Sequence, residues 1–553
     1  MKQEGFIDLI EQSIIQNWDL NALTDYQGIT LQYKDVARKI SKFHIVLKQA
    51  GIQPGDRIAV CGRNSAHWAV TYLATLTYGA VIVPILHEFK ADNIHHIVNH
   101  SESKLLFVGD RVWESLDENV MPGLMGVLLM NDFSLLICRE AKLKKAVENR
   151  NSLFGALYPK NFRHEHINYR KDSPEELAVI NYTSGTTGYS KGVMLPYRSL
   201  WSNVRYAEEI FRVKAGDTMV AILPMGHVFG MSADFLYGFT IGAHLYFLTR
   251  MPTPKIITES FAVIKPRSIA CVPLIVEKII KKNILPRVDN KLGKLLLRLP
   301  ITGDRIKALA RKEAMKMFGD NFDQIIIGGA PLNAEVEHFL KQINFPYTIG
   351  YGMTECGPFI TAHRWDTLKE GSCGKAASRM EVRIDSPDPQ NIAGELLCRG
   401  DNLMLGYYKD PAVTAEVVDK EGWLHTGDLG TIDTEGFITL RGRSKNMLLT
   451  SSGQNIYPEE IESKLNNMPY VAESLVVLQK EKPVALIYPD FEEAFANGLQ
   501  QSDIETAMEK NREELNRQLP AYAQIAKVKI HFEEFEKTAK KSIKRFLYQE
   551  AKG

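Results

Sequence analysis

Short apolar runs that suit buried strands alternate with helix-like segments as far as Ile327, and this alternation most limits the possible fold. The segment Tyr33–Ala50 has the pattern of a helix that ends at Gly51, a residue type that commonly stops helices. Strands that alternate with helices form parallel sheets whose faces the helices cover. The strand-like runs are Arg57–Cys61, Leu105–Val108, Leu177–Asn181, Thr218–Leu223, Ser268–Val272 and Gln324–Ile327. The sequence therefore predicts an α/β fold.

One uncharged segment, Ala66–Leu86, is about long enough to span a bilayer, which takes roughly 20 residues. Gly79 divides it into a helix-like part and a run rich in β-branched residues, Ala80–Ile85. A helix followed by a buried strand explains this pattern better than a membrane span.

The length of 553 residues predicts more than one domain, because single hydrophobic cores stop growing at about 250–300 residues. Short strand-like runs with turn signals replace the α/β pattern after Val382. From Leu448 onward the pattern is that of a small α+β domain of about a hundred residues. We therefore predict two domains, residues 1–443 and 444–553.

Composition and charge favour a cytoplasmic protein. The formal net charge is +1 and 45% of residues are apolar, so no overall field points to nucleic acid, and no DNA-reading motif is evident. The six cysteines form no CxxC pair and have no zinc-ligand spacing, which predicts reduced thiols. Residues 1–20 lack the continuous apolar run of a secretory signal.

The loop Tyr182–Gly192 has the chemistry of a phosphate site. Glycines let backbone N–H groups approach an anion, hydroxyls donate hydrogen bonds, and Lys191 adds a point charge. The spacing does not match a Walker A loop. Composition alone would also fit an ordinary flexible polar loop.

This loop closely resembles the phosphate loop of the adenylate-forming (AMP-binding) superfamily, which includes acyl-CoA synthetases, luciferases and the adenylation domains of peptide synthetases. Further segments resemble the family's other motifs in the family's order, and the ordered set is far more specific than any one motif. They are Leu223–Gly230, Gly328–Leu332, Tyr351–Glu355, Gly422–Asp428, Arg441–Lys445 and Ser451–Glu462.

The resemblance implies a fold and a nucleotide site. The expected fold is a large N-terminal region of two α/β subdomains and a small β-rich subdomain, followed by a small mobile C-terminal α+β domain. The expected ATP and AMP contacts are Thr183, Ser184, Gly185, Thr186, Thr187, Gly188, Lys191, Gly329, Ala330, Pro331, Tyr351, Gly352, Met353, Thr354, Asp428 and Arg443.

The resemblance also implies individual roles. Glu355 would hold Mg²⁺, Thr354 would donate to the α-phosphate, and His227 would border the acyl pocket, so these three are candidate catalytic residues. Lys445 would be the hinge about which the C-terminal domain rotates. Taken singly, each has an ordinary explanation: a surface acid for Glu355, or a packed histidine for His227.

The C-terminal tail departs from the family, which usually has an essential lysine there in a pattern like T-x-x-G-K-[ILM]-x-R. Counting from Thr538, or back from Ile543, places Lys541 at the glycine position and Ser542 at the lysine position. Lys541, or else Lys540, would replace the missing charge because lysine is a flexible point charge. The competing interpretation is a solvated basic tail.

The motifs most resemble those of long-chain fatty acyl-CoA synthetases. They imply a magnesium-dependent acid–thiol ligase of fatty acid metabolism, with ATP, Mg²⁺ and coenzyme A as cofactors and a medium- or long-chain fatty acid as substrate. Two alternatives remain: an acyl-adenylate former that loads a carrier-protein phosphopantetheine, and a nucleotide-binding pseudo-enzyme with impaired ligase activity, suggested by Ser542.

A basic stretch over residues 278–316 interleaves lysines and arginines with apolar residues. Such a stretch can lie on anionic lipid, which would place the protein at the inner membrane surface, or it can be a solvated helical surface.

Overall fold

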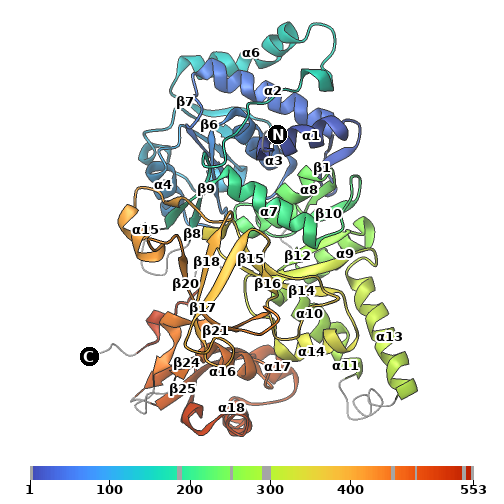
Figure 1. Ribbon diagram of the computed structural model, residues 1–553, viewed down its shortest axis with the longest axis vertical. Coiled ribbons are helices and arrows are strands. Elements are labelled where there is room, and N and C mark those ends of the chain that lie inside the picture. The colour runs from blue at the N-terminus through green and yellow to red at the C-terminus, as the bar shows by residue number, and fades with distance from the viewer. Residues whose placement is uncertain are drawn as a thin grey trace.

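The computed structural model describes residues 4–183, 190–249, 253–288, 300–449, 455–479, 482–537 and 543–549. Within these residues the chain forms two large mixed sheets, a smaller antiparallel sheet and a C-terminal α+β unit. In Figure 1 the first large sheet lies at one end of the long axis and the C-terminal unit at the other, and the antiparallel sheet lies beside the second large sheet between them.

The first large sheet is built mainly from the N-terminal part of the chain. Its strands β8, β4, β3, β5 and β6 are parallel, and antiparallel strands flank them on both sides. The order is β19 (Gly406–Tyr407), β9 (Lys191–Pro196), β8 (Leu177–Thr183), β4 (Val81–Ile85), β3 (Arg57–Cys61), β5 (Leu105–Val108), β6 (Gly126–Leu129), β7 (Leu135–Cys138). The helices of this part are α2 (Tyr33–Ala50), α3 (Ala66–Tyr78), α4 (Ala91–His100), α5 (Asp110–Trp113) and α6 (Ala141–Leu157).

The second large sheet is parallel from β1 to β14 and antiparallel at its two ends. The order is β16 (Lys375–Ala376), β15 (Phe359–Ala362), β14 (Tyr347–Gly352), β13 (Gln324–Gly328), β12 (Ser268–Cys271), β10 (Thr218–Ala221), β11 (His244–Phe247), β1 (Asn21–Asp25), β2 (Thr30–Gln32). Its helices are α1 (Phe6–Gln16), α7 (Tyr197–Ile210), α8 (Tyr237–Thr240), α9 (Pro254–Ile264), α10 (Pro273–Asn283) and α14 (Ala334–Gln342).

Local chemistry explains the uncharged helix α3. Ser65 caps its first turn by accepting a hydrogen bond from Trp68 N, and Gly79 ends it in a left-handed conformation with φ of 87°. The buried hydroxyls of Thr71, Thr75 and Thr77 donate to carbonyls one turn earlier, so they carry no unsatisfied polar group into the core. The predicted helix followed by a strand is confirmed, and among the described helices none is long and apolar enough to cross a membrane.

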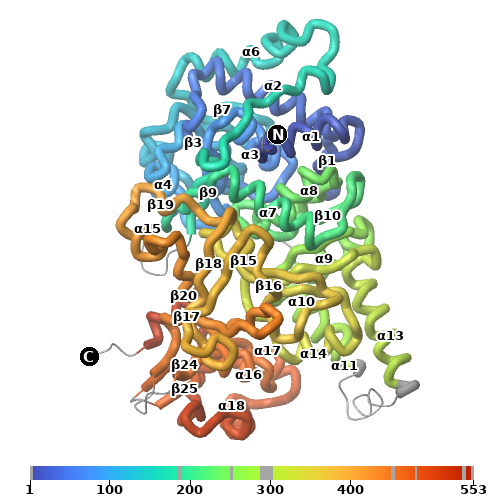
Figure 2. The backbone as a smooth tube through the Cα atoms, viewed as in Figure 1, coloured from blue at the N-terminus to red at the C-terminus, as the bar shows by residue number. Residues whose placement is uncertain are grey.

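The remaining strands form smaller units. The antiparallel sheet has the order β17 (Met380–Asp385), β18 (Gly394–Gly400), β20 (Leu424–Ile432), β21 (Ile438–Arg443). The C-terminal unit, red in Figure 2, contains β22 (Leu448–Leu449), β23 (Asn455–Ile456), α16 (Pro458–Leu465), β24 (Val471–Gln479), β25 (Lys482–Pro489), α17 (Phe491–Ala496), α18 (Gln501–Asn516) and β26 (Lys527–Ile530). Its buried side chains form core clusters of their own, separate from the cluster that joins the two large sheets.

The predicted fold class is confirmed, and the strand predictions differ only at their ends. The run predicted to end at Asn181 continues to Thr183 in β8, and the run predicted to reach Leu223 ends at Ala221 in β10. The boundary between residues 443 and 444 stays a prediction.

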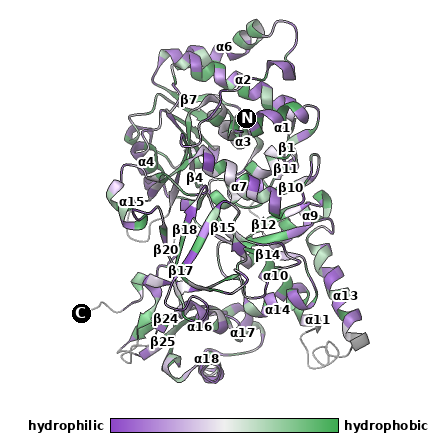
Figure 3. Cartoon of the chain, in the orientation of Figure 1, coloured by the Kyte–Doolittle hydropathy of each residue, from purple (hydrophilic) through white to green (hydrophobic). Residues whose placement is uncertain are grey.

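The basic stretch consists of α10, α11 (Leu285–Val288) and α13 (Pro300–Met317), with residues 289–299 outside the described part. Ala310 and Ala314 are buried where α13 packs on α9, whereas Leu309 is exposed. Figure 3 shows hydrophilic and hydrophobic residues together on α13, at the edge of the molecule. Contact of this surface with a membrane stays a prediction.

Candidate active site

The candidate residues gather at the carboxyl ends of parallel strands from both large sheets. The motif segments follow β8, β10, β13 and β14 directly. Asn181 on β8 donates from Nδ2 to the carbonyl oxygen of Gly226 at 3.0 Å, which joins the end of one sheet to the loop that follows β10 in the other. Ligands of open α/β sheets bind at this edge.

The loop that carries His227 is fixed by its backbone. Asn64 accepts from Met225 N at 2.8 Å and donates to the carbonyl of Leu223 at 2.7 Å. The Nδ1 atom of His227 accepts from Phe229 N at 3.2 Å, which leaves Nε2 as the proton-bearing nitrogen of the neutral ring. A π-helix, η3 (Gly230–Leu236), follows directly, a feature often found at functional sites.

A buried acid lies behind this loop. Asp234 in η3 is 1% exposed, and burial raises the pKa of its carboxyl. Its Oδ2 atom accepts from Leu223 N, just after β10, at 3.4 Å. Asp234 therefore links η3 to the segment that follows β10. No sequence pattern predicted a role for Asp234, because a single Asp in an apolar helix belongs to no motif.

The glycine motif after β13 allows close packing. A Cβ on Gly328 would lie 3.1 Å from the Phe229 ring and 3.1 Å from the carbonyl oxygen of Gly350, and Gly329 has φ of +86°. The missing side chains let the loop of His227 pack closely against the strands whose motifs are expected to contact ATP and AMP. Ala330 and Pro331 continue this turn and are exposed.

Glu355 and Lys191 meet through a tyrosine. Thr354 and Glu355 lie in a buried 3₁₀ turn, η4 (Thr354–Cys356), directly after Gly352 and Met353. The Tyr407 hydroxyl donates to Glu355 Oε1 at 2.8 Å, and Lys191 Nζ lies 5.2 Å from the centre of the Tyr407 ring. An ammonium, a ring and a carboxylate thus converge beside the phosphate loop.

The segment from Met404 to Tyr407 contacts the backbone beside both Glu355 and Lys191. Met404 N donates to the carbonyl of Glu355 at 2.8 Å, while Tyr407 itself pairs with Val193 on β9. Tyr407 was not among the residues predicted from the sequence. It lies between Gly406 and Tyr408, outside every recognised motif, so only the fold brings it to the site.

A second cluster joins β14, β20 and the end of β21. Tyr351 donates to Asp428 Oδ2 at 2.6 Å, and Arg443 Nε lies 3.0 Å from Asp428 Oδ1. Asp428 is buried whereas Arg443 is exposed. Burial raises the pKa of Asp428. The charge of Arg443 and the hydrogen bond from Tyr351 lower this pKa but do not cancel the effect of burial. The carboxylate is thus held ready to accept further hydrogen bonds.

Other predicted residues are placed differently or not described. Thr183 ends β8, and Lys445 is exposed in the 3₁₀ turn η5 (Ser444–Asn446) after β21. Lys540, Lys541 and Ser542 lie outside the described residues, and the same holds for Ser184, Gly185, Thr186, Thr187 and Gly188.

The donor set fits Mg²⁺ with a nucleotide. In the described part of the chain, no group of three or more His, Cys, Asp or Glu residues is placed to hold a metal. Mg²⁺ in nucleotide sites is commonly bound by one or two carboxylates with the substrate's phosphates, and Glu355 supplies such a carboxylate beside Lys191.

Comparisons with known proteins define the family. Residues 10–408 match the family described as AMP-binding enzyme, and residues 445–551 match the AMP-binding enzyme C-terminal domain. The chain therefore belongs to the AMP-binding enzyme family, as its motifs predicted.

Curated relatives are similar over most of the chain. The 7a-methyl-1,5-dioxo-octahydro-1H-inden-4-yl propanoyl:CoA ligase of Rhodococcus jostii (strain RHA1) is 29% identical, over 83% of this chain and 83% of its own. A long-chain-fatty-acid–CoA ligase of Escherichia coli O157:H7 is 26% identical, over 86% of this chain and 83% of its own.

A solved structure confirms the fold. The o-succinylbenzoate coenzyme A synthetase of Bacillus subtilis, in complex with ATP and a magnesium ion, aligns with a TM-score of 0.73. It is 20% identical, and the alignment covers 97% of this chain and 98% of that chain.

Proposed function

We propose that this protein is an AMP-forming acid–CoA ligase whose substrate is a medium- or long-chain fatty acid. The observation that carries the proposal is that Lys191, Tyr407 and Glu355 link the two large sheets, while the Tyr351–Asp428–Arg443 cluster links the second of them to the antiparallel sheet. One group of residues is suited to phosphates and the other to ribose, and the loop of His227 lies between the two sheets.

The proposed reaction has two steps. A carboxylate oxygen of the acid attacks the α-phosphorus of ATP, which forms acyl-AMP and releases pyrophosphate. The thiolate of coenzyme A then attacks the acyl carbon, which forms the thioester and releases AMP. The first step brings an anion to a polyanion, so positioning and charge stabilisation dominate its catalysis.

Each residue of the site has a proposed part in this reaction. Lys191 neutralises the β- and γ-phosphates with the hydroxyls of the loop, and Thr354 donates to the α-phosphate. Asp428 accepts from the ribose hydroxyls, and Tyr351 orients its carboxylate. Bound at Glu355, Mg²⁺ would supply positive charge to the phosphate oxygens.

The reactants agree with those of the family. The relatives reported above are named as CoA ligases, and the solved neighbour holds ATP and magnesium. ATP, Mg²⁺ and coenzyme A are therefore the reactants and the metal of this family's CoA ligases, as the sequence predicted. The proposal of a fatty acid as substrate is supported by the name of the Escherichia coli relative and by the wording of the motifs. The Rhodococcus jostii relative is named for a different acid.

We also propose the division of labour along the chain. Residues 1–443 would bind ATP and the acid, and residues 444–553 would rotate about Lys445, with Lys541 carrying the charge of the usual C-terminal lysine. A carrier-protein thiol as acceptor and a pseudo-enzyme that only binds nucleotide remain the alternatives.

The test is a coupled assay of both half-reactions. Purified protein is incubated with MgATP and carboxylic acids of increasing chain length, with and without coenzyme A, and pyrophosphate, AMP and acyl-CoA are quantified. We expect acyl-CoA and AMP in equal amounts from one class of chain length. Pyrophosphate with acyl-adenylate that persists despite coenzyme A would replace coenzyme A by a carrier protein.

The same assay distinguishes a ligase from a pseudo-enzyme that only binds nucleotide. If ATP binds, yet no acid in the series releases pyrophosphate, the ligase proposal fails. The variant Asp428→Asn is the matched control for binding, since it removes the charge of the proposed ribose acceptor with little change in side-chain size.

A further inference from the structure

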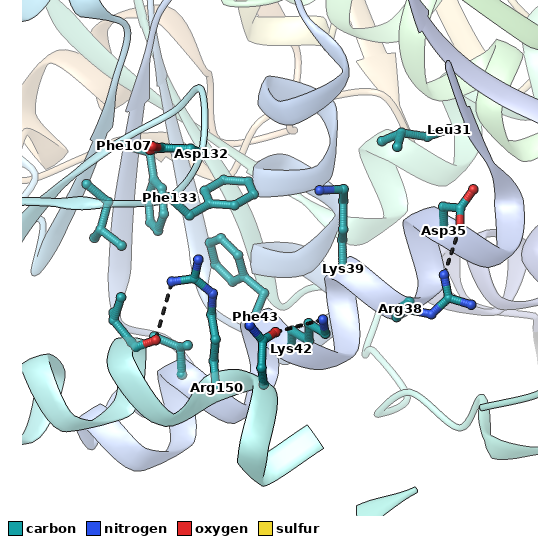
Figure 4. Close-up of a pocket in the computed structure, with 14 residues that line it drawn as sticks. Leu31, Asp35, Arg38, Lys39, Lys42, Phe43, Phe107, Asp132, Phe133 and Arg150 are labelled. Atoms are coloured by element: carbon teal, nitrogen blue, oxygen red, sulfur yellow. Dashed lines mark hydrogen bonds and ion pairs between the residues drawn. The ribbon is translucent and has the colours of Figure 1, made fainter. Parts of the chain in front are cut away.

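A cavity of about 300 Å³ lies at the opposite end of the molecule from the C-terminal unit, between α2, α6 and the edge of the first sheet. Figure 4 shows its lining, to which α2 contributes Lys39, Lys42 and Phe43 and α6 contributes Arg150. The lining includes no residue of the candidate active site. The volume is at the lower end of the range of small-molecule sites.

One part of the lining is apolar and well ordered by packing. Phe43 and Phe107 are buried, and their ring centres are 4.8 Å apart. Phe133, in the turn between β6 and β7, packs edge-on against both, at 5.8 Å from Phe43 and 6.0 Å from Phe107. The three rings form an aromatic wall, so an apolar group that enters the cavity would be removed from water.

The other part of the lining is cationic. Lys42 Nζ donates to Asn151 Oδ1 at 2.8 Å, Lys39 Nζ lies 3.2 Å from His67 Nε2, and Arg150 donates to the carbonyl of Val147 at 3.3 Å. All three cations are partly buried. In the described part of the chain, no carboxylate oxygen lies within 4 Å of any of them, so none is neutralised by an ion pair.

The fourth basic residue of the cavity differs from these three. Arg38 is paired with Asp35 at 2.8 Å, one turn away on α2. Asp132, the other acid of the lining, is exposed and accepts from Ser134 N within its own turn. The cavity thus has an excess of positive charge.

Crowding of these charges is unfavourable without an anion. Burial and then the charge of Lys42 lower the pKa of Lys39, while burial and the charges of Arg38 and Arg150 lower the pKa of Lys42. Burial also lowers the pKa of His67 to about 4, so the ring is neutral and accepts from Lys39. An anion in the cavity would relieve this repulsion.

We propose that this cavity is a second binding site, which takes a small amphipathic organic anion, with its carboxylate or phosphate on Lys39, Lys42 and Arg150 and its apolar body on the wall of Phe43, Phe107 and Phe133. In Figure 4 the cations and the rings lie next to one another in one cavity, and Lys39 Nζ is 5.9 Å from the centre of the Phe133 ring, so a ligand with a charged head and an apolar body would contact both.

The test is photo-crosslinking, which reports where the ligand binds and does not depend on ligase activity. The probe is decanoate with a diazirine on the chain, and the labelled peptides are identified by mass spectrometry. We expect labelling within residues 33–50 or 130–151, in addition to any labelling at the active site. In the double variant Lys42→Met with Arg150→Met, labelling there should fall roughly tenfold or more, because hydrogen bonds to charged groups are lost.

The matched control is Lys48→Met with Lys144→Met. It makes the same change of charge on the same two helices, at exposed lysines outside the cavity. Circular dichroism melting confirms that both double variants are folded. Loss of labelling in both variants alike, or no labelling in either residue range, would overturn the proposal.

Competition identifies the head group. Unlabelled decanoate, decyl phosphate, decanol and inorganic phosphate are each added against the probe. Protection by decanoate indicates a carboxylate and protection by decyl phosphate indicates a phosphate monoester, and either result supports the site. Equal protection by decanol would contradict the role of the cations.

Discussion

At the scale of single residues, Tyr407 shows how a side chain outside every motif can organise the site. Its hydroxyl donates to Glu355 and its ring lies beneath Lys191, so it separates two opposite charges that would otherwise approach each other. Glu355 and Lys191 are thereby both kept available to a ligand. If Glu355 holds Mg²⁺, Tyr407 acts by positioning it.

The variant Tyr407→Phe tests this role. Loss of a hydrogen bond to a buried carboxylate should lower kcat/KM for ATP roughly tenfold and raise the Mg²⁺ concentration for half-maximal pyrophosphate release. The measurement is pyrophosphate release against Mg²⁺ concentration. Tyr408→Phe is the control, because the Tyr408 hydroxyl donates to Glu102 instead, at 3.3 Å. Equal behaviour of the two variants would remove Tyr407 from the site.

At the scale of elements, α2 and α3 pack together around a histidine. The Nε2 atom of His44 on α2 lies 3.1 Å from the carbonyl of Ala74 and 3.0 Å from Thr77 Oγ1, both on α3. Burial lowers the pKa of His44 from 6.5 to about 4. The neutral ring is therefore part of the packing of these two helices.

This pKa shift makes stability depend on pH. Between pH 6.5 and pH 4 the unfolded chain binds a proton at His44 that the folded chain does not, so stability is lost as the pH falls through this range. The contribution is at most about 3 kcal/mol, since each pKa unit corresponds to about 1.4 kcal/mol. His44→Gln keeps a donor without a titrating ring and should flatten the pH dependence.

The measurement is the urea midpoint of unfolding at pH 7 and at pH 5. The difference between the two midpoints should be smaller in His44→Gln than in the unmodified protein. His164→Gln, at a half-exposed histidine, should leave the difference unchanged. A difference that is unchanged in His44→Gln would show that His44 does not couple folding to protons.

At the scale of the whole molecule, polar contacts connect the C-terminal unit to the rest. Arg441 Nη1 lies 3.3 Å from Glu460 Oε1, and Lys281 donates to Asn467 Oδ1 at 2.9 Å. Within the C-terminal unit, Arg545 pairs with the buried Glu462 of α16 and ties the end of the chain to this helix. Polar contacts of this kind are typical of domains that move relative to one another.

The variant Lys445→Pro tests the proposed hinge. Proline fixes its own φ and disfavours helical conformation at Ser444, so it restricts rotation of the backbone at this point. We expect thioester formation to slow at least about tenfold relative to adenylation, as gating motions limit many such steps. Single-turnover measurements of acyl-AMP and acyl-CoA separate the two steps.

The control for the hinge is Lys445→Ala at the same position. It removes the exposed side chain and leaves the backbone free, so both steps should keep their rates. Wild-type rates for both steps in Lys445→Pro would contradict the hinge assignment.

The sequence by itself determined the parallel strands, the helix and strand of Ala66–Leu86 and the family motifs, because these depend on local hydrophobic period and on short runs of residues. It named Lys191, Glu355, Asp428 and Tyr351 one by one, without showing how they meet. Only the tertiary structure shows that Tyr407 lies between Lys191 and Glu355 and that Asp234 is buried behind the loop of His227. The cavity beside α2 is likewise a feature of the tertiary structure alone. These features join segments far apart in the chain, and no local pattern records which distant side chains a fold brings into contact.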